Sequence, residues 1–465
     1  MTRPSEKDVV AAWQKWVRSG TALATEQGES VEIIYPGRRN DSQGADYQDA
    51  VITTSGRLMK GDIEVHVRSS DWWSHRHHLD PAYNRVVLHV VWWHDTEAPT
   101  SLRNGSTVPV LVLGAIRETS SERRSAVSHS SAQSTPCAGG ISGAAMERLA
   151  ELLDQAGNER FFAKAAEFQA DLAQVGAGQV LYRGIMGALG YSRNKMACLE
   201  LADRLPLTKL ESVASAKTSD EQCIIELQTL LIGMAGLMPS QRGTGYFRDG
   251  LTHRYIGILE RLWSSCRDGR EMSPDRWHLC CTRPYNSLMR RLAAMSYLIT
   301  RYREEGLLTG LWGRYVEDTP SYQDWRRMEE GLLVSADDYW GCHFDFGADS
   351  LAASPTVLGE GRASDIMINV LLPFSYVWGQ SAGRPELTTA ALDAYRRHPR
   401  LADNALLKHM RSQLRIGRLL VSSARRQQGL LHIYRTLCTQ GQCGRCSLFI
   451  SVRDEYPEPV VPEVG

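Results

Sequence analysis

The chain has 465 residues, and 53 lysine and arginine residues balance 53 aspartate and glutamate residues. This length suffices for two or three domains, because single hydrophobic cores stop growing near ~250–300 residues. The neutral balance excludes a global attraction to nucleic acid but leaves room for a local basic groove. No run of about 18 apolar residues occurs and the first residues are polar. We therefore expect no membrane-spanning helix, no signal peptide and a cytoplasmic location.

Residues 1–117 are predicted to form an α/β domain. Ser5 followed by Asp8 is typical of a helix-capping box, and apolar residues then recur at helical spacing as far as Val17. Turn residues and polar loops separate the strands that we predict at residues 31–35, 47–53, 62–68, 86–93 and 108–116. Residues 72–83 are predicted as loop or helix. This order of elements describes a compact α/β unit.

The predicted strand 62–68 alternates strictly between polar and aliphatic residues, the polar ones being Asp62, Glu64, His66 and Arg68. A period of two places these polar groups on one face of a strand. The ordinary interpretation is a half-buried strand with one solvated face. However, the following strand is apolar without a break, and the preceding one begins near Asp46 and Asp49. We therefore expect a buried sheet with carboxylates beside it, which predicts a divalent-cation site.

The remaining chain is predicted to be mainly helical. Residues 118–143 are rich in Ser, Thr, Ala and Gly and are predicted to be a flexible linker. Residues 144–451 carry apolar residues at helical spacing, punctuated by prolines, and form a predicted helical domain. The predicted helices include residues 146–153, 160–175, 221–237, 252–266, 287–302, 401–421 and 427–434. Residues 452–465 are rich in Pro and Glu and are predicted to be disordered.

Short motifs along the chain carry a resemblance to one bacterial family. They include Gly61-Asp62-Ile63-Glu64-Val65-His66, Ser69-Ser70-Asp71-Trp72, His75-Arg76-His77-His78, Leu189-Gly190-Tyr191, Leu372-Pro373-Phe374 and Gln427-Gln428-Gly429-Leu430. On these motifs the chain resembles the domain of unknown function 2851 family over nearly its whole length. The resemblance implies no particular activity, because the name of the family assigns none.

A second resemblance concerns Asp46 and the tripeptide Glu64-Val65-His66, on consecutive strands of a helix–three strands–helix–strand unit. This arrangement is similar to the restriction-endonuclease-like superfamily, PD-(D/E)XK. The resemblance implies a restriction-endonuclease-like mixed sheet in which Asp46 and Glu64 hold Mg²⁺ or Mn²⁺. His66 would stand where the superfamily has a catalytic lysine. Asp49 and Asp62 are further candidate ligands for the cation.

Two departures from that motif bear on catalysis. Ala45 stands where the motif has proline, and an imidazole replaces the lysine ammonium. A histidine with an ordinary pKa near ~6.5 accepts a proton from water at neutral pH, but it brings no permanent positive charge to a phosphate. Cleavage of nucleic acid is therefore our first hypothesis. A non-catalytic member of the same fold that binds nucleic acid or a partner protein is the alternative.

Six of the chain's 13 histidines fall between residues 66 and 94. The stretch containing His75, His77 and His78 predicts either a transition-metal site, phosphate contacts or structural hydrogen bonds. No nearby Glu completes a known zinc-hydrolase motif, but a His-rich zinc hydrolase remains a third hypothesis. His89 lies in an apolar strand and is predicted to be a core histidine. The residues that we predict to contact a substrate are Arg68, Trp72, His75, His77, His78 and Arg283.

Three cysteines near the end of the chain, Cys438, Cys443 and Cys446, have the spacing C-x4-C-x2-C. Thiolates at such spacing suit Zn²⁺ or a 4Fe-4S cluster, and His432 is the nearest candidate for a fourth ligand. Arginines on the predicted helices, including Arg290 and Arg291, predict either a solvated face or a groove for phosphates. The aromatic segment 339–346 is predicted to form an interdomain contact. The sequence sets no oligomeric state.

Overall fold

The computed structural model describes residues 4–19, 23–40, 43–115, 143–243, 250–279, 287–313, 320–347 and 356–448. Two compact units are present. Unit 1 comprises Met1–Gly157, Asp403–Ser422 and Arg426–Gly465, and unit 2 comprises Asn158–Ala402 and Ser423–Arg425. This partition differs from the expected boundaries, because the C-terminal segment groups with the N-terminal sheet. The predicted linker, apart from Gly143, and the predicted tail lie outside the described residues.

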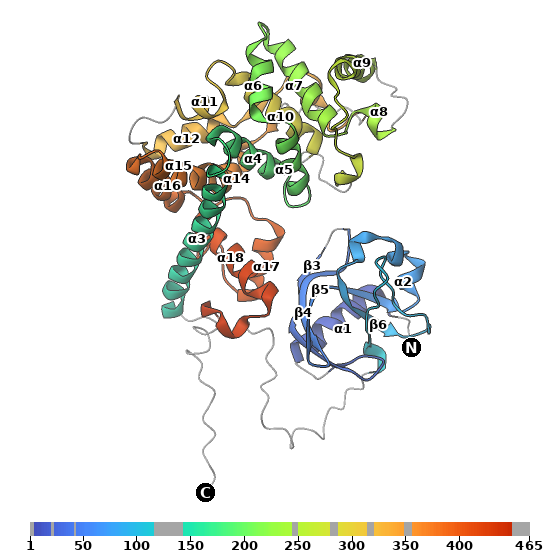
Figure 1. Ribbon diagram of the computed structural model, residues 1–465. Coiled ribbons are helices and arrows are strands. Elements are labelled where there is room, and N and C mark those ends of the chain that lie inside the picture. The colour runs from blue at the N-terminus through green and yellow to red at the C-terminus, as the bar shows by residue number, and fades with distance from the viewer. Residues whose placement is uncertain are drawn as a thin grey trace. The chain divides into compact units, whose positions relative to one another are not determined.

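Unit 1 is built on a mixed sheet with the strand order β1-β2-β4-β5-β6-β7, and β3 pairs with β4 (Figure 1). The strands are β1 (Leu23–Ala24), β2 (Ser30–Tyr35), β3 (Arg38–Arg39), β4 (Tyr47–Thr54), β5 (Arg57–Arg68), β6 (Val86–Trp93) and β7 (Val110–Val112). β5, β6 and β7 run parallel to one another, and the other pairs are antiparallel. The last predicted strand is shorter than expected, because the chain turns into a 3-10 helix at Leu113–Ala115.

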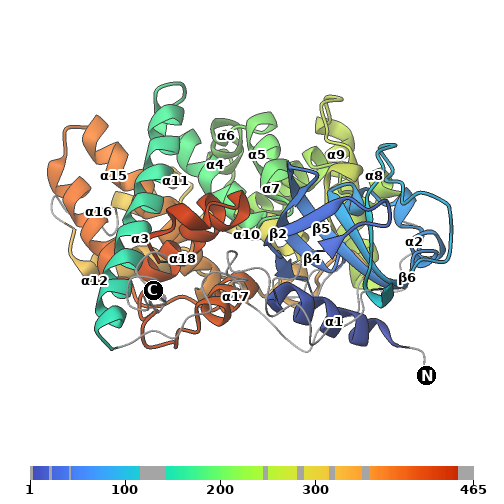
Figure 2. The ribbon, with the colours of Figure 1, turned by 90° about the horizontal axis from the view of Figure 1, so that it is seen from below.

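Both faces of β5 are buried from Gly61 to Val67. Helix α1 (Glu6–Ser19) crosses one face, where Val9 and Trp13 pack with the aliphatic side chains of β5 (Figure 2). The polar side chains on the opposite face are also covered, since Asp62, Glu64 and His66 are 5%, 6% and 1% exposed. The half-buried interpretation is therefore wrong, and the expected buried sheet is confirmed.

Three short helices lie between β5 and β6. They are α2 (Asp71–Ser74) and the 3-10 helices η1 (His77–Leu79) and η2 (Pro81–Tyr83). Trp72 and Tyr83 form a small core with Ala45 and Val86. This core covers the polar face of β5 and brings histidines from α2 and η1 toward the strand.

The C-terminal segment packs on the sheet of unit 1. It contains α17 (Ala405–Leu414) and α18 (Ala424–Thr436), followed by the 3-10 helices η7 (Cys438–Gln440) and η8 (Cys443–Arg445). Tyr35 of β2 and Val51 of β4 share a hydrophobic core with these elements and with the first part of α3 (Gly143–Leu172). The predicted helix 401–421 is shorter than expected. It ends at Leu414, because Arg415 adopts a left-handed conformation with φ +54°.

Unit 2 is mainly helical, and its core draws on nearly all of its helices. They are α4 (Ala177–Leu189), α5 (Lys195–Arg204), α6 (Leu207–Ser215), α7 (Asp220–Met234), α8 (Pro239–Arg242), α9 (Gly250–Cys266), α10 (Leu288–Arg301), α11 (Leu307–Gly313), α12 (Tyr322–Gly331), α13 (Tyr339–Cys342), α14 (Glu360–Ile366), α15 (Leu372–Ser381) and α16 (Pro385–Arg397). A two-stranded sheet, β8 (Val334–Ser335) and β9 (Thr356–Leu358), accompanies them. Two predictions made for this region need correction.

The aromatic segment 339–346 lies in the core of unit 2, where the Trp340 indole donates a hydrogen bond to the Tyr255 hydroxyl over 2.8 Å. It is therefore not an interdomain contact. Arg290 and Arg291 are 1% and 6% exposed, which contradicts a solvated face. Both guanidinium groups donate to backbone carbonyls of β9, at Thr356 and Val357. These arginines hold the small sheet against α10.

One stretch, Asp220–Arg242, is long and apolar enough to cross a membrane by length and composition. Within the fold, 72% of its apolar window is buried. Such burial is what the core helix of a soluble protein shows.

Candidate metal centre

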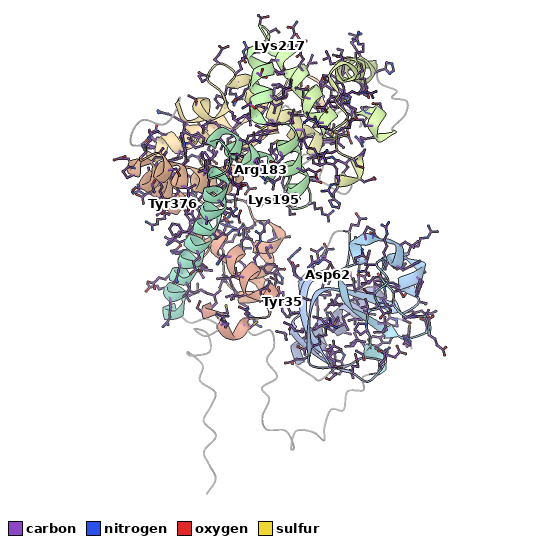
Figure 3. The ribbon with its side chains drawn as sticks, in the orientation of Figure 1. Tyr35, Asp62, Arg183, Lys195, Lys217 and Tyr376 are labelled. Atoms are coloured by element: carbon purple, nitrogen blue, oxygen red, sulfur yellow. The ribbon has the colours of Figure 1, made fainter. Side chains whose placement is uncertain are left out.

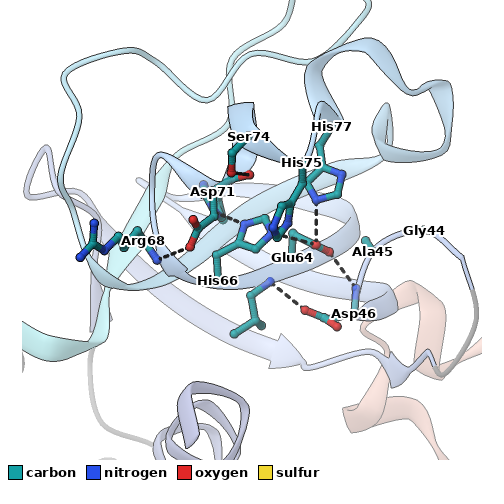
Figure 4. Close-up of polar contacts among 12 residues, drawn as sticks. Gly44, Ala45, Asp46, Glu64, His66, Arg68, Asp71, Ser74, His75 and His77 are labelled. Carbon is teal, nitrogen blue, oxygen red and sulfur yellow. Dashed lines mark hydrogen bonds and ion pairs between the residues drawn. The ribbon is translucent and has the colours of Figure 1, made fainter. Parts of the chain in front are cut away.

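β5 presents Glu64 and His66 on the same face, two residues apart (Figure 4). One carboxylate oxygen of Glu64, Oε2, accepts a hydrogen bond of 3.0 Å from the backbone N–H of Asp46. The other, Oε1, lies 3.4 Å from Nε2 of His66 and 3.5 Å from Nε2 of His77. The backbone of Asp46, directly before β4, therefore fixes the carboxylate of Glu64, and the second carboxylate oxygen faces two imidazoles.

The turn after α2 brings two more histidines to this point. His75 follows the last residue of α2, and His77 begins η1. Arg76 between them has φ +62°, a left-handed conformation that non-glycine residues adopt only at a cost. This reversal lets both neighbours turn toward β5, and Nδ1 of His75 lies 3.2 Å from Nε2 of His66 (Figure 4).

Within the described ranges, one group of at least three His, Cys, Asp or Glu side chains has ligand atoms that all lie within 4.8 Å of one another. It consists of His66, His75 and His77. His66 and His77 are buried and His75 is exposed, so the group opens to solvent on one side. Nε2 of His77 is buried and has no hydrogen-bond partner among the described residues, although it faces Glu64.

A second layer of polar side chains lies behind His66. Its Nδ1 atom is 2.9 Å from Nε2 of His89, and Nδ1 of His89 is 3.0 Å from Oγ1 of Thr100. Both His89 and Thr100 are buried, at 0% and 3% exposed. The prediction that His89 is a core histidine is confirmed, and its polar atoms are satisfied by this chain of contacts.

Burial shifts the titration of the whole group. It lowers the pKa of His66 to about 2, of His89 to about 3 and of His77 to about 4, and nearby imidazoles add to each shift. Neutral imidazoles are the form that binds metals. Burial, reinforced by the negative charge of Asp46, raises the pKa of Glu64 to about 9. Without a cation, the carboxyl group therefore holds a proton at neutral pH.

Asp46 does not meet Glu64 as a second carboxylate ligand would. Its Oδ2 atom accepts a hydrogen bond of 3.1 Å from the backbone N–H of Val65, and its own N–H donates to Glu64. Figure 4 shows the two carboxylates on opposite sides of the strand pair. The contacts of Asp46 are those of a residue that positions Glu64, and a Mg²⁺ shared by the two carboxylates stays a prediction.

Asp49 and Asp62, the other predicted ligands, form a separate group. The backbone N–H of Asp49 donates to Oδ1 of Asp62 over 3.0 Å, and Arg85 pairs with Oδ1 of Asp49 over 3.0 Å. Tyr434 donates to Oδ2 of Asp49. Asp62 is labelled in Figure 3. The guanidinium group of Arg85 also lies 3.8 Å from Oδ1 of Asp62, so one positive charge faces two carboxylates, and a cation at this pair stays a prediction.

The other residues predicted to contact a substrate differ from one another in their burial and in their contacts. Trp72 has no exposed surface and donates from its indole to the carbonyl of Ser101, so its side chain belongs to the core and offers no surface for the predicted substrate contact. The His78 ring packs against Trp73 with ring centroids 4.3 Å apart and the ring planes tilted by 43°. Arg68 is partly exposed and lies 3.8 Å from Asp95. Arg283 lies outside the described residues.

Cys438 and Cys443 begin the two 3-10 helices after α18, and Cys446 directly follows the second. Cys438 and Cys446 are buried, and Cys443 is half-buried. Burial, with Cys446 nearby, raises the pKa of the Cys443 thiol. A site for Zn²⁺ or an iron–sulfur cluster at these thiols, with His432 as the fourth ligand, stays a prediction.

The sequence pointed to the separate parts of this centre but not to their combination. The sequence indicated His75 and His77 as metal ligands without a carboxylate beside them. It indicated Glu64 as a metal ligand together with Asp46. Thr100 was missed, because a single threonine in a polar loop carries no signal. The two short motifs Glu-x-His and His-x-His, nine residues apart at His66 and His75, were the signal that could have joined them.

Comparison with known proteins adds the family. No curated protein and no solved structure matches the chain. One family model matches residues 6–404, which include the whole of the centre described above. The chain belongs to the family described as protein of unknown function, DUF2851.

Proposed function

We propose that the protein is a metal-dependent hydrolase that cleaves phosphodiester bonds in DNA or RNA. The observation that carries the proposal is the group of ligand atoms from His66, His75 and His77, all within 4.8 Å of one another, with Oε1 of Glu64 beside His66 and His77. A divalent cation bound at such a point supplies a water of lowered pKa and positive charge for the phosphate. The side chains present are suited to holding a cation.

The open side of the centre is suited to receiving a substrate. His75 and Arg76 are exposed, whereas the other candidate ligands are covered by α2, η1 and η2. Arg76 adds positive charge on the solvent side, next to two of the histidines. A phosphate that approaches from solvent meets this residue first. The buried side holds Glu64 through the backbone of Asp46, which keeps the carboxylate oriented.

The choice of a phosphodiester rests on the order of the elements. An N-terminal helix, the antiparallel pair β4–β5, a short helical connection and the parallel strand β6 follow one another as in the nuclease superfamily that the sequence resembles. Glu64 and His66 occupy the Glu-x-Lys positions of that motif. This support comes from topology and motif, and the reaction itself is the proposal.

Incubation of the full chain with single- and double-stranded DNA and RNA in the presence of Mn²⁺, Zn²⁺ or Mg²⁺ tests the proposal. We expect cleavage of at least one substrate and a loss of about 100-fold or more in Glu64→Gln, since acid–base and metal-ligand groups contribute at this level. Glu32→Gln, at an exposed position of β2, is the matched control. Absence of cleavage with every substrate and metal, or equal cleavage by Glu64→Gln, would contradict it.

Binding without cleavage would support the alternative. In that case the chain would retain nucleic acid in a salt-sensitive manner, because phosphate contacts release counterions. The affinity would be the same in Glu64→Gln as in the unchanged protein. A gel-shift titration at two salt concentrations measures both properties.

A further inference from the structure

The donor atoms at the centre favour a particular class of cation. Three imidazole nitrogens lie within 4.8 Å of one another there, and one carboxylate oxygen of Glu64 lies beside two of these rings, 3.4 Å from His66 and 3.5 Å from His77. Magnesium prefers oxygen ligands and keeps several waters, whereas imidazole suits zinc and related transition metals. The nitrogen-rich set therefore differs from the all-oxygen pair, Asp46 and Glu64, that the nuclease resemblance implies.

The spacing of the atoms agrees with that class. Zn–N bonds of about 2.0–2.1 Å in a tetrahedral site place neighbouring ligand atoms about 3.3–3.4 Å apart. Nε2 of His66 lies 3.2 Å from His75 Nδ1 and 3.4 Å from Glu64 Oε1, and Glu64 Oε1 lies 3.5 Å from His77 Nε2. Three of the six separations in a four-ligand site are therefore close to the tetrahedral value, and the three imidazoles have ligand atoms within 4.8 Å of one another.

A hydrogen-bond network alone accounts poorly for these contacts. Nε2 of His66 carries either one proton or one lone pair in the plane of the ring, so it makes one hydrogen bond there. Both His75 and Glu64 approach that atom. Nε2 of His77, which is buried, makes no hydrogen bond to any described residue. A cation at the common point would satisfy all of these atoms at once.

The contacts behind His66 orient it for such a role. If the Thr100 hydroxyl accepts from Nδ1 of His89, then Nε2 of His89 is an acceptor for the Nδ1–H of His66. This arrangement leaves the lone pair of His66 Nε2 directed at the common point. Metal-binding histidines are usually held in this way through their second ring nitrogen.

We infer that the centre binds a zinc-like transition-metal ion through Glu64, His66, His75 and His77, and that His89 and Thr100 are positioning residues for His66. Asp46 takes part only by holding Glu64. The inference rests on the proposed function for its catalytic meaning, but the binding of the ion is testable without any substrate.

The first test measures metal bound to the full chain. The protein and its variants are stripped with a chelator, saturated with Zn²⁺, dialysed and analysed for metal content, and affinity is measured by competition with a coloured chelator. We expect His75→Ala to hold about one ion less per chain or to bind at least tenfold more weakly. His78→Ala is the matched control, because His78 lies three residues after His75 and its ring packs against Trp73.

Comparing the metal content of each variant with that of the unchanged protein cancels any metal bound by the C-terminal thiols. Any ion held by Cys438, Cys443 and Cys446 contributes equally to the unchanged protein and to both histidine variants. Equal metal content and affinity in the unchanged protein and His75→Ala would overturn the inference. A loss in His78→Ala as large as that in His75→Ala would overturn the assignment of ligands.

The second test separates positioning from folding. Thr100→Val keeps the shape of the side chain and removes the hydroxyl, whereas Thr100→Ser keeps the hydroxyl. We expect Thr100→Val to weaken Zn²⁺ binding by about 10–100-fold and to change the visible absorption of the Co²⁺-loaded protein. Thr100→Ser should restore both properties. Equal affinity and equal spectra in all three proteins would overturn the positioning role.

These outcomes are distinguishable from failure of the proposed function. If the chain binds Zn²⁺ as expected but cleaves no nucleic acid, the metal site stands and the phosphodiesterase proposal falls. If cleavage occurs but His75→Ala equals the unchanged protein in Zn²⁺ content and affinity, the phosphodiesterase proposal stands and this inference falls.

Discussion

The phenolic hydroxyl of Tyr434 donates a hydrogen bond of 2.9 Å to Oδ2 of Asp49, a residue that lies 385 positions earlier in the chain. Arg85 donates to the other oxygen of the same carboxylate over 3.0 Å. Asp49 itself has φ +61° and lies where the pairing of β4 with β5 is interrupted. The C-terminal segment is therefore attached to the strand next to the candidate metal centre.

Removal of this hydroxyl should destabilise unit 1. In Tyr434→Phe the Asp49 carboxylate loses a donor, and hydrogen bonds to charged groups contribute about 1.5–3 kcal/mol. We expect a lower free energy of unfolding by about 1–2 kcal/mol because Arg85 remains, measured by urea denaturation. Tyr322→Phe, at an exposed position, is the control and should change little. Equal losses in the two variants would show that the Asp49 contact contributes nothing.

Gly61 lies where β5 approaches β6 too closely for a side chain. A Cβ atom there would lie 2.2 Å from the carbonyl oxygen of Arg85 and 2.5 Å from a methyl group of Val87. Gly61→Ala must separate the two parallel strands, and we expect a destabilisation of about 1–3 kcal/mol or more. Gly444→Ala, where the added atom meets nothing within 4 Å, is the control. A thermal unfolding midpoint of Gly61→Ala equal to that of the control would contradict the pairing.

Substitutions of Asp46 distinguish between two roles for this residue, a metal ligand and a residue that positions Glu64. Asp46→Asn keeps an oxygen that can accept from the Val65 N–H, so a positioning role predicts little change in Zn²⁺ affinity. Asp46→Ala leaves that buried N–H unsatisfied and should cost about 1–3 kcal/mol of stability. Metal competition and urea denaturation measure the two effects. A loss of metal affinity in Asp46→Asn as large as in Glu64→Gln would make Asp46 a ligand.

The stability of the metal-free protein should pass through a maximum with pH. The pKa values of His66, His77 and His89 are lowered to about 2, 4 and 3, so their contribution is present above the unfolded value near ~6.5 and is lost as the pH falls. The pKa of Glu64 is raised to about 9. Its contribution to stability is therefore present below pH ~4.5, the unfolded pKa, and is lost as the pH rises from there to the folded pKa of about 9.

Just below pH ~6.5 the three histidines make the free energy of unfolding rise with pH, whereas Glu64 makes it fall, so the histidines dominate. Above pH ~6.5 only Glu64 still changes the free energy of unfolding. We therefore expect the free energy of unfolding to fall on the acid side and, less steeply, on the alkaline side of a maximum near neutral pH. Glu64→Gln should lose the alkaline fall and keep the acid one. Urea denaturation at pH ~5, ~7 and ~9 measures this, and an unchanged alkaline slope in Glu64→Gln would show that the carboxyl group is not titrating.

Local patterns in the sequence determined most elements of unit 1. The alternation through residues 62–68 placed Glu64 and His66 on one face of a strand, because successive side chains of a strand point to opposite sides. The capping residues Ser5 and Asp8 set the start of α1. These features depend on backbone geometry over a few residues, so the sequence alone could show them.

Only the tertiary structure decided which of these residues meet. His75 and His77 reach Glu64 because Arg76 reverses the backbone and Trp72 is packed beneath the turn. Thr100 reaches His89 from the loop after β6, and Tyr434 reaches Asp49 from the far end of the chain. Such contacts depend on how all the apolar faces are buried together, and no pattern within one segment encodes that arrangement.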